Sequence, residues 1–322
     1  MERQKPRFYK GLRGFTRSDD EALARDIEGT IYWWWWNYLR LSPAFWFAKE
    51  TGYPIIDPQM AKTYELAGDL RNSNFRQWWD QTGKIVFAEV KRPPKVLALN
   101  LDALHEHPFK ENALYLEVPL TIRKETILKK IKEELNKVHD GRELDVTKIA
   151  NAPLKLYTKR YRLRIIELEY WVFLYRLLYS EIPMWRIGDR LQIAPHLKLR
   201  GVEWELAKSK FNQLASMTGR YHYKAKYLLA NAEQMSFPNT KKTSSKKPQP
   251  FGRKHHNDFV LATSTEDDKN PPWKQWLRNE FETDLKYEIA RRNRVADQLK
   301  LPGSKVRLKM PDFIAGKTDL LN

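Results

Sequence analysis

The chain has 322 residues, with 58 Lys+Arg against 40 Asp+Glu and a formal net charge of +18. Its hydrophobic fraction of 42% suffices for a core, which excludes a chain disordered throughout. No run approaches the ~20 uncharged apolar residues that cross a bilayer, and the first residues lead into no signal-type apolar segment. We therefore expect a cytoplasmic protein without a membrane partner. The absence of Cys excludes disulfides, thiolate metal sites and thiol nucleophiles.

The positive charge is the strongest signal in the composition. A surplus of this size creates a surface potential that attracts polyanions at a distance. The predicted partner is therefore nucleic acid, and duplex DNA first. A charge that serves only solubility, or a basic surface that meets an acidic protein, remains an alternative.

Residues 1–150 are predicted to form a tryptophan-rich α+β domain. Its central element is a helix over 30–52 that is broken and restarted at Ser42-Pro43. The adjacent tryptophans Trp33–Trp36 point in different directions, so protein should surround this helix, and Trp78 and Trp79 should pack against it. Packing is favoured over a base-stacking platform for single strands. Further elements are helices at 58–68, 75–83 and 121–138 and strands at 85–90, 95–101 and 113–118.

Residues 151–237 are predicted to be helical and helix-turn-helix-like. The segment 214–229 (LASMTGRYHYKAKYLL) has a small residue, Ala215, where two helices would touch, and Gly219 four positions later for a turn. Ala225 and Leu228 would hold the second helix. An earlier segment, 183–193, resembles a first helix of the same kind with Gly188 at a close approach, but a poor recognition helix follows it, so we assign it a supporting role.

The second helix of this unit is the predicted DNA-contacting element. A basic, polar helix face of this kind can meet phosphates and base edges in a major groove. One departure from the pattern is an arginine directly after the turn glycine, where an apolar residue is usual. A basic helical hairpin within the core is the alternative. The predicted contacts are Arg220, Tyr221, His222, Tyr223, Lys226 and Tyr227.

Residues 238–272 are rich in Lys, Ser and Pro and are predicted to form a flexible basic linker. Its cations could follow a DNA backbone or simply be solvated. They are Lys241, Lys242, Lys246, Lys247, Arg253 and Lys254. The neighbouring His255-His256 pair diverges and lacks a third ligand, so we expect no metal and no cofactor. Residues 273–322 comprise a helix over 273–299, whose apolar face needs a packing partner, and a basic tail.

A nuclease is the main enzymatic alternative. Glu89-Val90-Lys91 ends a predicted strand, and with an upstream acid such as Asp57 or Asp80 it is the pattern by which one class of nucleases holds magnesium. A tyrosine recombinase is disfavoured because Arg220, His222 and Tyr223 share one helix. Gly-rich phosphate loops and Gly-x-Ser-x-Gly elbows do not occur.

One set of segments carries a family resemblance. The order YWWWWNYLRLSPAFWF, YELAGDLRNSNFRQWWDQTGKIVFAE, ALYLEVPL, MWRIGDRL and RYHYKAKYLLANAEQMSFP resembles uncharacterised proteins of bacterial integrative and phage-like elements, over about residues 30–238. Ala67 stands where that family usually has an aromatic residue before Gly68-Asp69. The resemblance implies a regulator-like or DNA-binding protein of a mobile genetic element. It implies no catalytic residue.

The sequence thus predicts an α+β, predominantly helical protein that binds DNA without catalysing a reaction. Two hypotheses from other classes remain: a nuclease or recombinase subunit that uses magnesium, and a structural subunit of a nucleoprotein or protein complex. A protein partner or self-association is expected through the N-terminal domain or the 273–299 helix.

Overall fold

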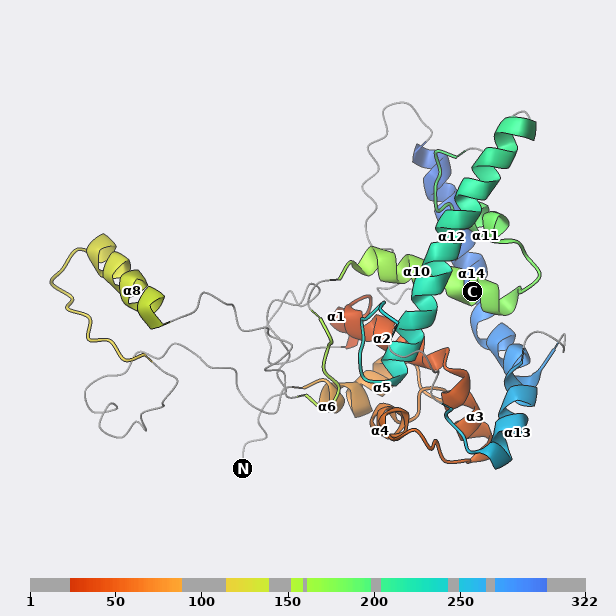
Figure 1. Cartoon of the computed structure of the whole chain (residues 1–322), viewed down its shortest axis with the longest axis horizontal. Helices are drawn as coiled ribbons and strands as arrows, with labels where there is room; N and C mark the ends of the chain where they lie inside the picture. The colour runs from red at the N-terminus through yellow and green to blue at the C-terminus, as the bar shows by residue number, and fades with distance from the viewer. Residues whose placement is uncertain are drawn as a thin grey trace. The chain divides into compact units, whose positions relative to one another are not determined.

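The computed structural model describes residues 24–88, 114–138, 152–158, 161–197, 204–242, 249–264 and 270–299. The chain divides into two compact units, one formed by residues 1–90 with 150–322 and the other by residues 91–149. Within the described ranges every regular element is helical. The predominantly helical class is confirmed, whereas the strands expected of an α+β fold do not occur in those ranges (Figure 1).

The first unit contains all but one of the described helices. They are α1 (Ala24–Ile27), α2 (Ile31–Arg40), α3 (Pro43–Thr51), α4 (Pro58–Ala67), α5 (Phe75–Trp78), the π-helix η1 (Trp79–Gly83), α6 (Lys84–Val86), α10 (Leu163–Leu178), α11 (Met184–Arg190), α12 (Trp204–Glu233), α13 (Arg253–Thr263) and α14 (Pro272–Leu299). None of the described helices combines the length and apolar character needed to span a bilayer.

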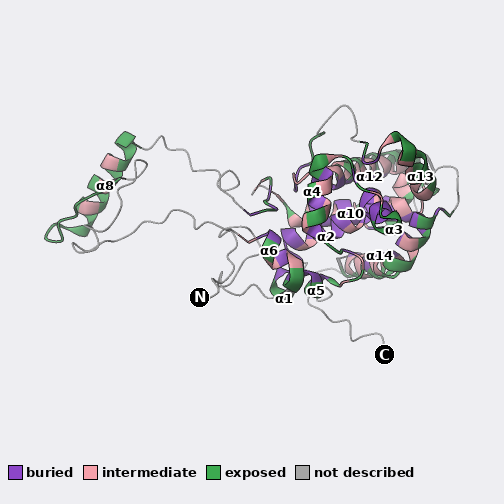
Figure 2. Cartoon of the chain, turned by 90° about the horizontal axis from the view of Figure 1, so that it is seen from below, coloured by how far each residue is buried: buried purple, intermediate pink, exposed green. Residues whose placement is uncertain are grey.

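Helix α2 is the centre of the core, as its sequence predicts. Eight of its ten residues are buried, among them three of the four adjacent tryptophans. Trp35 Nε1 donates to the Ala232 carbonyl of α12 at 3.4 Å, and Tyr38 Oη donates to the Ile166 carbonyl of α10 at 3.2 Å. Trp78 lies 6.2 Å from Trp36, ring centre to ring centre. These rings supply buried area and are not free to stack on bases (Figure 2).

Residues at the C-terminal end of α12 form hydrogen bonds with the N-cap residues of α3 and α4. Ser42, the N-cap of α3, accepts from the Phe45 amide and donates its hydroxyl to Glu233 Oε1 at 2.6 Å. Asp57, the N-cap of α4, accepts from the Met60 amide and from Gln234 Nε2 at 3.0 Å. The predicted break at Ser42-Pro43 is therefore confirmed, and both caps are tied to a helix almost two hundred residues away.

The apolar face of α14 packs against other helices of the same unit. Trp273, Leu277, Phe281 and Leu285 are buried, and the helix contacts α10, α13 and α3. At its C-terminal half Arg291 and Arg292 pair with Glu288 of the same helix and with Glu167 of α10. The apolar face expected to seek a partner is thus covered within the chain.

The strands predicted in the N-terminal part are wrong where the structure describes them. Residues 84–86 form α6, because the chain continues as helix through η1 instead of stopping at Gly83. Phe87 N still donates to the Gly83 carbonyl at 3.0 Å, and the Phe87 ring lies 4.4 Å from Tyr32. The apolar run therefore fills the aromatic core as a helical turn. Residues 114–119 have no regular structure, and 95–101 lie outside the described residues.

The flexible linker predicted over 238–272 is also wrong in part. Phe251 is buried against Phe47 of α3 at 5.0 Å, and α13 begins two residues later and packs on α3 and α14. His255 stacks on Tyr53 at 3.9 Å. A short aromatic and apolar set, dispersed among lysines and prolines, is enough to fix this segment to the core.

The second unit is described over residues 114–138. It contains α8 (Lys124–Val138), which confirms the amphipathic helix predicted at 121–138. None of the residues of α8 is buried, as Figure 2 shows.

Candidate nucleic-acid interface

The predicted turn at Thr218-Gly219 does not exist, because α12 is one continuous helix over Trp204–Glu233 (Figure 1). Thr218 Oγ1 donates to the Leu214 carbonyl at 2.8 Å, which keeps that carbonyl within the helix. A glycine within a helix costs only ~1 kcal/mol relative to alanine. The buried residues Leu214, Ala225 and Leu228 outweigh this cost where α12 packs on α10 and α11. The helix-turn-helix prediction for 214–229 is therefore wrong.

The supporting role predicted for 183–193 is confirmed. Helix α11 packs along α12, and Gly188 lies at their close approach. A Cβ atom at Gly188 would stand 2.2 Å from Thr218 Oγ1 and 2.9 Å from Leu214 Cδ1. The missing side chain therefore allows the two helices to touch.

Four of the six residues predicted on α12 lie on its open side. Arg220, Tyr223 and Lys226 are exposed, Tyr223 by 60%, and Tyr227 is partly covered. The rings of Tyr223 and Tyr227 meet edge to face at 5.2 Å. Arg220 Nη2 lies 3.5 Å from Ser216 Oγ on the preceding turn. This side of α12 offers cations, hydroxyls and aromatic rings to a partner.

The other two residues turn toward the protein. Tyr221 packs against the core, and the His222 ring lies 5.7 Å from Phe173 of α10. Burial, together with the nearby charges of Lys226 and Arg176, lowers the pKa of His222 to about 4. His222 is therefore neutral at physiological pH and contributes no charge to phosphate binding. These two predicted contacts belong to the packed side of the helix, because a continuous helix fixes their direction.

The structure adds exposed residues that the predicted turn obscured. Lys208, Asn212, Ser216 and Lys224 are all exposed on α12. The signal that would have found them is in the sequence. Residues 206–232 contain five Lys/Arg and no Asp or Glu.

The predicted linker cations divide into three pairs. Lys241 and Lys242 are exposed after the end of α12, where Asn231 Nδ2 donates to the Lys241 carbonyl at 3.0 Å. Arg253 and Lys254 are exposed on the first turn of α13. Lys246 and Lys247 lie outside the described residues.

The two described pairs, Lys241/Lys242 and Arg253/Lys254, lie close to the same end of α12. Ile56 N donates to the Pro250 carbonyl at 2.7 Å, just before α13 begins. The next residue along from Ile56, Asp57, accepts from Gln234 at the end of α12. Both pairs therefore lie near the C-terminal end of α12, whereas Arg220 and Tyr223 lie three turns nearer its middle.

The acids proposed for a nuclease have structural partners. Asp57 caps α4, and Asp80 forms an ion pair with Lys84 on the next helical turn. Glu89 and Lys91 lie outside the described residues. In the part of the chain that the structure describes, no three His, Asp or Glu side chains converge as a metal site would require.

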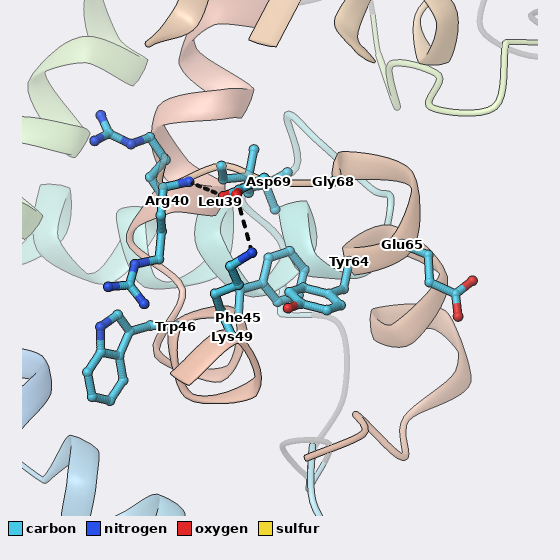
Figure 3. Close-up of a pocket in the computed structure, with 11 residues that line it drawn as sticks. Leu39, Arg40, Phe45, Trp46, Lys49, Tyr64, Glu65, Gly68 and Asp69 are labelled. Atoms are coloured by element: carbon cyan, nitrogen blue, oxygen red, sulfur yellow. Dashed lines mark hydrogen bonds and ion pairs between the residues drawn. The ribbon is translucent and has the colours of Figure 1, made fainter. Parts of the chain in front are cut away.

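A cavity of about 240 Å³ lies between α2, α3, α4 and the turn at 69–71 (Figure 3). Each cation that lines it is paired with a carboxylate: Lys49 with Asp69 at 3.2 Å, Arg71 with Glu50, and Arg40 with Glu280. Hydrogen bonds from the amides of Arg71 and Asn72 and from Lys49 lower the pKa of Asp69 to about 2, against the opposing effect of its partial burial. Asp69 is therefore ionised, and its carboxylate accepts the hydrogen bonds that hold this wall of the cavity together.

Both arginines of this cavity lie between aromatic rings. Arg40 lies 4.5 Å from the Trp36 ring and 4.7 Å from that of Phe281, and Arg71 lies 5.9 Å from Trp46 and 5.1 Å from Trp276. This stacking explains why Nε of each arginine is buried without a hydrogen-bond acceptor. The cations that line the cavity are thus balanced by acids, whereas residues 206–232 of α12 contain cations and no acid.

Comparison with protein-family models, curated proteins and solved structures finds no match.

Proposed function

We propose that this protein is a non-enzymatic DNA-binding protein, a regulator or accessory factor of a mobile genetic element, that engages duplex DNA through the exposed side of α12. The observation that carries the proposal is the segment 206–232, which has five cations and no acid. Four of those cations are exposed: Lys208, Arg220, Lys224 and Lys226.

The physical basis is the release of counterions. Each phosphate that a Lys or Arg neutralises sets free condensed cations, which favours binding most at low salt. An ion pair with a neighbouring acid would remove much of that gain, and residues 206–232 of α12 contain no Asp or Glu. Lys241, Lys242, Arg253 and Lys254 extend the positive surface at the end of the helix.

The test is a titration of fluorescent duplex DNA at several salt concentrations. We compare the wild type with Arg220→Ala/Lys226→Ala and with Lys286→Ala/Arg294→Ala, a control on α14 that removes the same charge from exposed positions. The slope of log K against log salt should fall by ~0.9 for each phosphate that α12 no longer neutralises, and it should remain unchanged in the control.

Two results would overturn the proposal. One is no binding of the wild type at low salt. The other is an equal loss in both double variants, which would mean that total charge, and not α12, drives binding. Binding of an acidic polypeptide as tight as that of DNA would support the structural-subunit hypothesis instead.

A further inference from the structure

The continuity of α12 arranges its exposed residues in a central stripe with a charged edge on each side. At about 100° per residue, Asn212, Ser216 and Tyr223 fall within about 40° of one another around the helix axis. All three are exposed. The buried residues Leu214 and Ala225 fall on the opposite side, at about 200° from Asn212. The stripe therefore points directly away from the core.

Cations border this stripe on both sides. Lys208 and Lys226 are separated by five full turns and share one edge, at about 40° from Asn212. Arg220 and Lys224 lie on the other edge, at about 80° and 120°. Between Asn212 and Tyr223 the stripe contains no charged residue. A helix with this order of side chains presents uncharged hydrogen-bonding groups in the middle and a cation to each flank.

This arrangement matches the major groove of B-form DNA. The groove is ~12 Å wide and admits one α-helix, with a phosphate backbone along each wall and base edges on its floor. An asparagine amide can pair with adenine N6 and N7, and a serine hydroxyl with either a donor or an acceptor. Gly219 also falls near the stripe, and nothing lies within 4 Å of where its Cβ would be. Small residues there let the helix backbone approach the groove floor.

We infer that α12 lies in the DNA major groove as a single continuous helix, with Asn212, Ser216 and Tyr223 facing the bases and the Lys208/Lys226 and Arg220/Lys224 edges gripping opposite strands. This inference rests on the proposed function. From Asn212 to Tyr223 the helix rises ~16 Å, which corresponds to about five base pairs. The partner is B-form DNA because the major groove of double-stranded RNA is too narrow to admit the helix.

The experiment first selects a preferred site from random duplexes with the wild-type protein. Affinity for that site and for a scrambled duplex is then measured for Asn212→Ala, Ser216→Ala and Lys208→Ala. Asn279→Ala is the matched control, because Asn279 is an exposed amide on α14. Melting temperatures check that each variant is folded.

Asn212→Ala should reduce the ratio of the two affinities by roughly 5- to 150-fold, the effect of removing one bidentate hydrogen-bond pair to a base, while its salt slope stays that of the wild type. Ser216→Ala should reduce the ratio less. Lys208→Ala should weaken both duplexes alike and lower the slope by ~0.9. Replacing purine N7 by carbon within the selected site should mimic Asn212→Ala, because N7 lies in the major groove.

Failure of this inference and failure of the proposed function would give different results. Salt-dependent binding with no selected site, or with the same discrimination in Asn212→Ala, Ser216→Ala and Asn279→Ala, overturns the base-facing stripe and leaves the proposed function intact. No DNA binding at low salt overturns the proposed function and the inference together.

Discussion

The two longest helices, α12 and α14, carry similar numbers of cations and use them in opposite ways. Over its whole length α12 has five Lys/Arg and two acids, Glu205 and Glu233 at its ends, whereas α14 has six Lys/Arg and five Asp/Glu. On α14 the arginines Arg291 and Arg292 are mostly covered and are shared between Glu167 and Glu288. Charge that is paired and covered holds helices together, and charge that is exposed and unopposed is available to a partner. The net charge of +18 is therefore informative only once its location is known.

The largest effect is expected at Glu288, which lies at the centre of the ion pairs between α14 and α10. Glu288→Ala should lower the free energy of unfolding by roughly 3–5 kcal/mol, because it leaves two mostly covered arginines with one carboxylate between them. Denaturant unfolding measures the loss. Lys286→Ala, which breaks an exposed pair with Glu282, should cost less than ~1 kcal/mol. Equal costs for the two variants would contradict the distinction between paired and available charge.

The next largest effect is the pH dependence of stability that Glu233, at the end of α12, should cause. Burial raises the pKa of Glu233 to about 7, and Asp57 adds to the rise while the Ser42 hydrogen bond opposes it. Because the folded-state pKa lies above the unfolded value of ~4.3, its stabilising contribution is complete below pH ~4.3 and is lost as pH rises toward 7.

Glu233→Gln keeps a hydrogen-bond acceptor for Ser42 and does not ionise. Unfolding at pH 5 and pH 8 should show the variant gaining on the wild type by up to about 3 kcal/mol across that range. A constant difference at the two pH values would show that Glu233 ionises normally in the folded protein. Glu169, whose pKa burial also raises to about 7, should leave a second, similar pH dependence in both proteins.

The contact between α11 and α12 should respond with an intermediate loss. Gly188→Ala introduces a methyl group into a space where Thr218 Oγ1 is 2.2 Å away, and overpacking of this kind costs ~1–3 kcal/mol. The midpoint of thermal unfolding measures it. Thr218→Ala removes that hydroxyl oxygen. If Gly188→Ala costs as much in the Thr218→Ala background as in the wild type, the close approach is not where the structure places it.

The smallest effect has the opposite sign. Gly219→Ala should stabilise the protein by ~1 kcal/mol, because Gly219 lies within a helix and nothing is within 4 Å of the added Cβ. In a helix-turn-helix with Gly219 in a positive-φ turn the same substitution would destabilise. The sign of this change therefore separates a continuous α12 from the arrangement predicted by sequence.

The sequence predicted the elements in which local signals and tertiary packing agree. The tryptophan helix, its break at Ser42-Pro43 and the C-terminal helix all have strong periodicity or a capping residue, and all are present. The failures occurred where a local signal was weak. Thr218-Gly219 is a common turn pair, but packing along 214–228 overrides it. The run Ile85-Val86-Phe87 is too short for its period to distinguish strand from helical turn.

The candidate interface was predicted in part for the same reason. The exposure of Arg220, Tyr223 and Lys226 agrees with the sequence, because a positive, polar segment is visible without knowing the fold, and their contact with DNA stays a prediction. Tyr221 and His222 lie on the packed side of α12, which the sequence could not show, because side-chain direction depends on the phase of one long helix and the expected turn would have changed that phase. The alignment of Lys208 with Lys226 across five turns appears only when the helix is continuous.

The contacts around α2 constrain how the protein is made. Trp35 is bonded to Ala232, 197 residues later, and Arg40 is paired with Glu280, 240 residues later. At ~5–20 residues per second, ribosomes expose the tryptophan helix for roughly 10–40 s before its partner on α12 is synthesised. During that interval an apolar, tryptophan-rich segment has no native surface to cover it. The newly made N-terminal part should therefore depend on chaperones, and truncation before α12 should yield an insoluble product.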